Sequence, residues 1–155
     1  MLTAGAMMLT TAAIAGGADA PLGYQLMCLQ NPAECKSTGA SKAIGKNATL
    51  ATLVKINNTI NKKMTPKHDV AGLDQWSANA QSGDCEDFAL AKRVALIKLG
   101  FPSASLHIAY GKRNGEPHAV LVANIKGGKY VLDMPGIEKK VKPISATPYK
   151  HWRTL

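Results

Sequence analysis

The stretch Gly83-Asp84-Cys85-Glu86-Asp87 marks the start of the best-defined element in the chain, a helix. Asp84 is a suitable N-cap, and Asp87, three residues later, stands at the capping-box position. Gly100 ends the helix. Cys85 is therefore predicted to lie in the first helical turn. Four apolar residues recur at helical spacing and predict one buried stripe: Phe88, Ala91, Ala95 and Leu99.

Runs rich in branched and aromatic residues follow that helix and predict three β-strands: Leu106–Tyr110, His118–Ile125 and Tyr130–Asp133. The hairpin signals Asn114-Gly115 and Gly127-Gly128 separate them. Upstream, apolar spacing predicts a helix over residues 50–61, whereas residues 21–45 are expected to be irregular. The tail from residue 134 is expected to add at most one edge strand. Helices followed by an antiparallel meander indicate an α+β fold, with the Cys85 helix packed on the sheet.

The position of Cys85 favours a reactive thiol, but acidic residues surround it. Unpaired N–H groups and the positive end of the helix dipole favour a thiolate in the first turn. Asp84, Glu86 and Asp87 share that turn, and three nearby carboxylates raise the pKa of a thiol. A positive group must offset them, either a protonated His118 or a divalent cation held by Asp84 and Glu86. The acidic residues can equally be a plain helix cap.

His118 opens one predicted strand and Asp133 ends the next, so antiparallel pairing brings them toward the same edge of the sheet. With Cys85 they can form a Cys-His-Asp triad, in which the carboxylate orients the imidazole. A two-residue turn at Gly127-Gly128 places Asp133 opposite Val122, about four residues short of His118. A longer turn, a bulge or a twist has to close that gap. The alternative for His118 is an ordinary residue at a strand edge.

Two features near the N-terminus predict export from the cytoplasm. Residues 1–18 carry no charged side chain and lead into Ala18-Asp19-Ala20, so residues 1–20 are predicted to be a signal peptide, with an uncleaved N-terminal helix as the alternative. Cys28 and Cys35 lie close together around a proline, which suits a local disulfide, although two buried thiols also fit. A zinc site is disfavoured, because no second pair of ligands stands at suitable spacing. We expect a periplasmic or secreted protein with no membrane span after signal removal.

The composition fits a single globular domain over residues 21–155. The chain of 155 residues has 46% hydrophobic residues, enough for one core, and a formal net charge of +9. Basic residues, among them Lys92 and Arg93, are scattered without interleaved aromatic residues or a nucleic-acid motif. We therefore expect a solvated basic surface that favours acidic partners, and no binding of nucleic acid.

Three segments together strongly resemble the bacterial transglutaminase-like cysteine peptidases: residues 83–90, 118–122 and 130–133. The resemblance extends over nearly the whole chain after residue 20, and it implies a papain-like or transglutaminase-like fold. It also implies a triad in which Cys85 is the nucleophile, His118 the general base and then acid, and Asp133 the orienting residue.

The same resemblance implies a cofactor and a class of substrate. Characterised members of the family are periplasmic, calcium-dependent endopeptidases that clip large surface adhesins and so control biofilm attachment. Their calcium depends on acidic residues beside the nucleophile, which match Asp84 and Glu86 here. The chain departs from the family at Met134, where the family usually has Asn, and in a short segment after Asp133.

Two classes of function follow from these residues. The first is a cysteine endopeptidase acting on a protein substrate, and a transglutaminase would use the same residues with an amine in place of water. The second is a non-catalytic module on the same fold, which binds calcium through the acidic turn or an acidic protein through the basic surface. The sequence does not identify the natural substrate.

Overall fold

The computed structural model describes residues 19–155. The predicted signal peptide therefore lies outside the described residues, apart from Asp19 and Ala20. The longest helices of the described part are α3 (Leu50–Lys63) and α4 (Cys85–Lys98), with 14 residues each. Among residues 19–155, no helix combines the length and the apolar character that crossing a membrane requires.

The segment predicted to be irregular contains two short helices, α1 (Leu22–Gln30) and α2 (Pro32–Cys35). A disulfide joins Cys28 in α1 to Cys35 in α2, as the sequence predicted. The prediction of irregular structure was wrong because α1 is apolar on both sides and shows no amphipathic period. Its buried residues are Gly23, Tyr24, Met27 and Cys28, and its exposed ones include Leu22, Leu26 and Leu29.

The helix predicted at residues 50–61 is confirmed as α3. Its N-cap is Thr49, whose hydroxyl accepts a hydrogen bond from the N–H of Thr52 at 3.2 Å. Leu53 and Asn57 are its buried residues, and the helix packs against α4. α3 thereby supports the helix that carries Cys85.

α4 begins at Cys85 as predicted, but the face that it buries differs from the predicted stripe. Leu99 is 38% exposed, and Asp84 forms no side-chain capping bond within the described residues. The apolar period was misleading because the buried face of α4 includes two cations, Lys92 and Arg93. The apolar residues buried with them are Phe88, Ala89, Leu90 and Leu96. Carbonyl groups make this possible by accepting hydrogen bonds; Arg93 donates to the carbonyls of Leu106, at 3.3 Å, and Glu34, at 2.7 Å.

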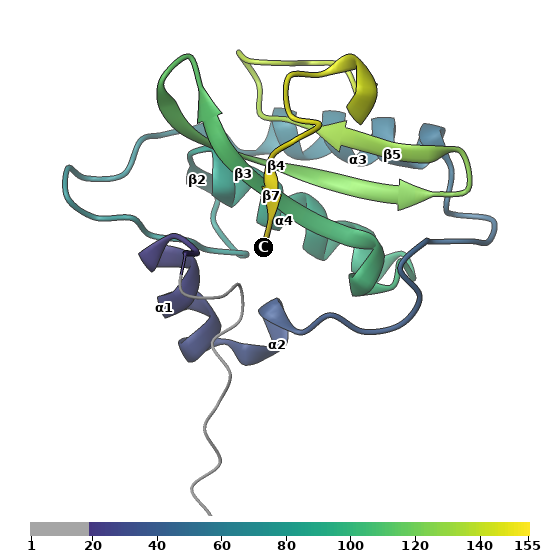
Figure 1. Ribbon diagram of the computed structural model, residues 1–155, viewed down its shortest axis with the longest axis horizontal. Coiled ribbons are helices and arrows are strands. Elements are labelled where there is room, and N and C mark those ends of the chain that lie inside the picture. Colours follow the sequence, from purple (N-terminus) through teal and green to yellow (C-terminus); the bar gives the residue numbers. More distant parts are fainter. Residues whose placement is uncertain (1–18) are drawn as a thin grey trace, which may run out of the picture.

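The main sheet has five strands in the order β6-β5-β4-β3-β7, all antiparallel (Figure 1). The three predicted strands are confirmed as its centre: β3 (Leu106–Arg113), β4 (Glu116–Ile125) and β5 (Gly128–Leu132). The C-terminal segment supplies both edges, β6 (Lys142–Pro143) and β7 (Arg153–Thr154). The expectation of at most one further strand was wrong, because two-residue strands leave no periodicity to read. A separate parallel pair joins β1 (Thr65–Pro66) to β2 (Ser82–Gly83).

The register of β4 and β5 differs from the prediction in the place of the turn. Ile125 pairs with Gly128, so the two turn residues are Lys126 and Gly127 rather than the two glycines. Val131, and not Asp133, therefore lies opposite Val122. This shift brings Asp133 two residues closer to His118 along β4, without a bulge.

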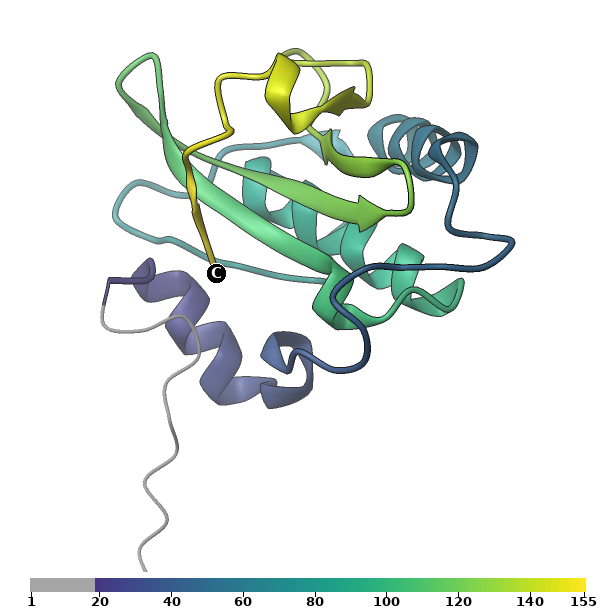
Figure 2. The same cartoon turned by 45° about the vertical axis from the view of Figure 1, so that its right-hand side comes forward.

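Different segments of the chain pack on the two faces of the sheet. α4 packs on β4 from one side, where Ala119, Leu121 and Ala123 belong to the larger core. On the other side Val120 and Val122 contact the C-terminal segment. Figure 2 shows this segment, in yellow, passing across the strands of the sheet and ending toward α1 and α2. Residues of the C-terminal segment that form this second core include Ile144, Tyr149 and Trp152. The C-terminal segment thus completes the fold around β4, the strand that carries His118.

Candidate active site

Cys85 lies where α4 meets β4. The backbone N–H of Ala119 in β4 donates a hydrogen bond to Cys85 Sγ at 3.4 Å, which fixes the thiol at this contact. The turn into α4 requires a glycine at position 83, because a Cβ there would collide with the Asp87 carboxylate. Asp87 in turn accepts a hydrogen bond from the N–H of Ser77 at 2.8 Å, so it ties the preceding loop to the helix start.

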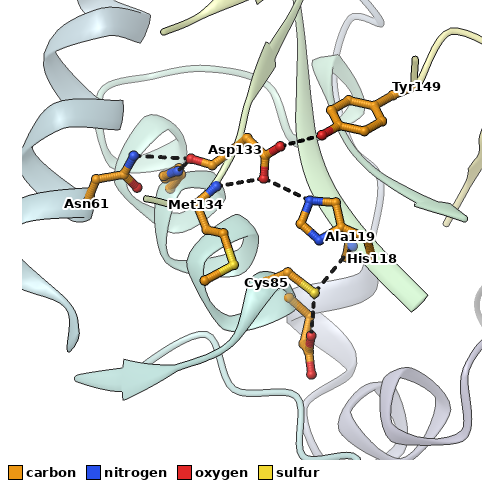
Figure 3. Close-up of polar contacts among 9 residues, drawn as sticks. Asn61, Cys85, His118, Ala119, Asp133, Met134 and Tyr149 are labelled. Atoms are coloured by element: carbon orange, nitrogen blue, oxygen red, sulfur yellow. Dashed lines mark hydrogen bonds and ion pairs between the residues drawn. The ribbon is translucent and has the colours of Figure 1, made fainter. Parts of the chain in front are cut away.

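His118 and Asp133 are in direct contact, as the sequence predicted. His118 Nε2 lies 2.9 Å from Asp133 Oδ1, and both side chains are buried. An ionised carboxylate only accepts hydrogen bonds, so the imidazole proton of this contact lies on Nε2. Figure 3 shows the His118 ring between the Asp133 carboxylate and the sulfur of Cys85. The structure thus brings all three predicted triad residues together.

Asp133 is held at its backbone as well as at its side chain. Its carbonyl oxygen accepts hydrogen bonds from Lys92 Nζ, at 2.5 Å, and from Asn61 Nδ2, at 3.1 Å. Its carboxylate accepts the N–H of Met134 and the hydroxyl of Tyr149, each at 2.7 Å (Figure 3). Met134 takes part in this network through its main-chain N–H, so its apolar side chain costs Asp133 none of these hydrogen bonds.

Acidic side chains converge on the other side of Cys85. Asp84 and Glu86 form one cluster with the thiol, and Asp69 and Asp74 form a second with Glu86; in each cluster the potential ligand atoms lie within 4.8 Å of one another. Oδ1 of Asp84 is buried and has no hydrogen-bond partner among the described residues. Four carboxylates and an unsatisfied oxygen suit a hard divalent cation such as calcium, which takes oxygen ligands. The residues present therefore fit a calcium ion.

Without a cation, this environment opposes ionisation of Glu86 and of the Cys85 thiol. Burial, and then Asp84, raise the pKa of Glu86 to about 9. The thiol of Cys85 donates a hydrogen bond to Glu86 Oε2 at 3.1 Å. Burial first, and then Glu86, raise the pKa of Cys85 far above its ordinary value. Activation of the thiol therefore requires positive charge beside it.

Comparison with known proteins identifies the family. A sequence profile of the bacterial transglutaminase-like cysteine proteinases (BTLCP) matches residues 14–154. The chain belongs to this family. Comparison with curated protein sequences gives no significant match.

Solved structures show the same fold for this member of the family. Calcium-bound LapG of Legionella pneumophila is 28% identical, with a TM-score of 0.54 over 66% of this chain and 60% of LapG. EGTA-treated LapG is 27% identical, with a TM-score of 0.55 over 68% of this chain and 61% of LapG. The chain thus spans about three fifths of the length of these LapG chains. The match confirms the predicted α+β, transglutaminase-like fold.

Several residues of the transglutaminase-like site were missed at the level of sequence: Asn61, Asp69, Asp74, Lys92 and Tyr149. Lys92 had a usable signal, because it follows Cys85 by seven residues and so lies on the same face of the helix. The others lie on α3, in the loop before β2, or in the C-terminal segment. Only the tertiary fold brings them to the site.

Proposed function

We propose that this chain is a cysteine endopeptidase with Cys85 as nucleophile, His118 as general base and acid, and Asp133 as the orienting residue. The contact of 2.9 Å between His118 Nε2 and Asp133 Oδ1, beside a cysteine at a helix start, is the observation that carries the proposal. A buried His–Asp pair next to a thiol at the positive end of a helix is the arrangement that a cysteine nucleophile needs.

The roles follow from which atoms are already engaged. His118 uses Nε2 to bond Asp133, so Nδ1 remains to take the proton of the Cys85 thiol. The thiolate then adds to the carbonyl carbon of the peptide. The N–H of Cys85, at the first position of α4 and so without a partner inside the helix, is suited to hold the oxyanion. His118 returns the proton to the departing amine as the C–N bond breaks. Water, deprotonated by His118, then cleaves the thioester and restores the thiol.

The proposal includes a calcium ion that Asp84 and Glu86 hold, with further carboxylate ligands from Asp69 and Asp74. When bound, the ion supplies positive charge that favours the thiolate of Cys85. Its fit rests on the unsatisfied Asp84 Oδ1 and the buried Glu86. One solved structure of L. pneumophila LapG is calcium-bound and another is EGTA-treated, which supports including a calcium ion in the proposal.

The substrate in this proposal is a protein on the cell surface, and the location is the periplasm or the exterior. The disulfide between Cys28 and Cys35 supports an oxidising compartment. The family resemblance supports a large surface adhesin, whose cleavage would release cells from a biofilm.

Cleavage of fluorescently labelled, unfolded casein tests the activity. We expect cleavage in calcium, little in EGTA, and none by Cys85→Ala at an unchanged melting temperature. Retained cleavage by Cys85→Ala would refute the assignment of the nucleophile. Cleavage by neither protein, together with a calcium-induced thermal shift, would favour the non-catalytic calcium-binding module.

Thermal shifts test the calcium site independently of activity. At a hundredfold excess over its Kd, calcium should stabilise the chain by about 2.7 kcal/mol, or roughly 5–10 °C. Asp84→Asn and Glu86→Gln should lose this shift. The matched control Glu138→Gln, which removes a partly exposed carboxylate elsewhere, should keep it. An equal shift in all four proteins would place the ion elsewhere.

A further inference from the structure

We propose that Tyr149 is a positioning residue, whose hydroxyl holds the Asp133 carboxylate in the orientation that bonds His118. The inference rests on the proposed Cys-His-Asp triad and adds to it a residue from the C-terminal segment. Tyr149 acts through Asp133 and touches neither the thiol nor the substrate.

The two oxygens of the Asp133 carboxylate have separate partners. Oδ2 accepts the Tyr149 hydroxyl at 2.7 Å. Oδ1 accepts His118 Nε2 at 2.9 Å and the N–H of Met134 at 2.7 Å. A carboxylate bonded through one oxygen can still turn about its Cβ–Cγ bond, whereas donors on both oxygens fix its plane. Tyr149 therefore determines which oxygen faces His118.

Bulk water cannot readily replace this hydroxyl, because the contact is enclosed. Tyr149 is 3% exposed and Asp133 is 1% exposed. Burial, and then Asp133, raise the pKa of Tyr149, so the hydroxyl keeps its proton and remains a donor. Loss of the hydroxyl would leave one oxygen of a buried carboxylate without a partner.

Aromatic packing keeps the hydroxyl in place. The ring centroids of Tyr149 and Trp152 are 4.5 Å apart, and each ring lies 5.9 Å from the His118 ring. Gly111, which pairs with His118 in the sheet, makes room for this group: a Cβ at position 111 would lie 2.7 Å from the Trp152 ring. Pairing of β7 with β3 anchors the segment just beyond Trp152.

A double-mutant cycle separates positioning from general support of the fold. The readout is the rate constant for alkylation of Cys85 by iodoacetamide, in calcium, well below each variant's melting midpoint. The four proteins are wild type, Tyr149→Phe, Asp133→Asn and the double variant. Phe keeps the ring, so its contacts with Trp152 and His118 remain. Tyr130→Phe is the matched control, since its hydroxyl bonds the carbonyl of Gly127 on an exposed hairpin.

We expect Tyr149→Phe to slow alkylation by about tenfold in the wild-type background. In the Asp133→Asn background it should change the rate by less than about twofold, because a group that acts only through Asp133 has no further effect once that carboxylate is gone. Tyr130→Phe should react like wild type.

Two results would overturn the inference: a wild-type rate for Tyr149→Phe, or an equal slowing in both backgrounds, which would indicate general structural support. A wild-type rate for Asp133→Asn would instead refute the triad on which the inference rests. The two failures are thus distinguishable in one experiment.

Discussion

Replacing Lys92 with Met should remove a defined pH dependence from the stability of the protein. Lys92 is fully buried under Asp133, and burial lowers its pKa from 10.5 to about 7. Between these two values the unfolded chain binds a proton that the folded chain has lost. Stability therefore rises with pH across this window, and the cost of burying the ammonium is largest at and below pH 7.

The magnitude follows from the pKa. Each pH unit between the folded and the unfolded pKa adds up to about 1.4 kcal/mol to the free energy of unfolding. Integrated from pH 7 to pH 8.5, one lysine with a folded pKa of about 7 contributes about 1.5 kcal/mol to the free energy of unfolding. Met has a similar length and no charge, so the contribution disappears in Lys92→Met.

Urea unfolding at pH 7, 7.5, 8 and 8.5, followed by tryptophan fluorescence, measures this difference. The free energy of unfolding of wild type should rise by about 1.5 kcal/mol relative to Lys92→Met over this range. Lys98→Met, at an exposed position of the same helix, should follow wild type. Parallel curves for wild type and Lys92→Met would refute the reasoning, because other titrating groups are common to both proteins.

Three further substitutions test the packing around the site. Gly111→Ala should push the Trp152 ring away from His118, because the new Cβ would lie 2.7 Å from that ring. We expect a red-shifted tryptophan emission and slower alkylation of Cys85. An unchanged emission and an unchanged alkylation rate would contradict this prediction. Leu121→Ala, in the centre of β4, should cost about 3 kcal/mol in urea unfolding, against less than about 1 kcal/mol for the exposed Leu99→Ala. Cys35→Ser should cost about 2 kcal/mol, and a reductant should lower the stability of wild type by the same amount but leave the variant unchanged.

The centre of the fold could be predicted because its signals are local. The Gly83 to Asp87 string places Cys85 at a helix start, and alternation with turn glycines defines the three central strands. The pairing register could not be fixed in this way. A turn at Lys126-Gly127 and one at Gly127-Gly128 differ by a single position in the sequence, yet they move Asp133 by two residues along β4.

What the sequence did not predict depends on contacts between distant segments. Lys92 and Arg93 were assigned to a solvated surface, because the sequence does not show that main-chain carbonyl groups in the core accept their hydrogen bonds. Asp74 and Tyr149 are 11 and 64 residues from Cys85, and no period links them to it. The acidic cluster and the support of Asp133 therefore emerge only from the fold.

The most direct test of the Cys85–His118 pair is the rate of Cys85 alkylation by iodoacetamide from pH 5 to pH 9, in calcium and in EGTA, for wild type and His118→Ala. We expect wild type in calcium to react fast well below the ordinary thiol pKa of about 8.5. Both His118→Ala in calcium and wild type in EGTA should react slowly there, because burial, and then Glu86, raise the pKa of Cys85. Identical profiles for wild type and His118→Ala in calcium would show that the His118 imidazole does not activate the Cys85 thiol.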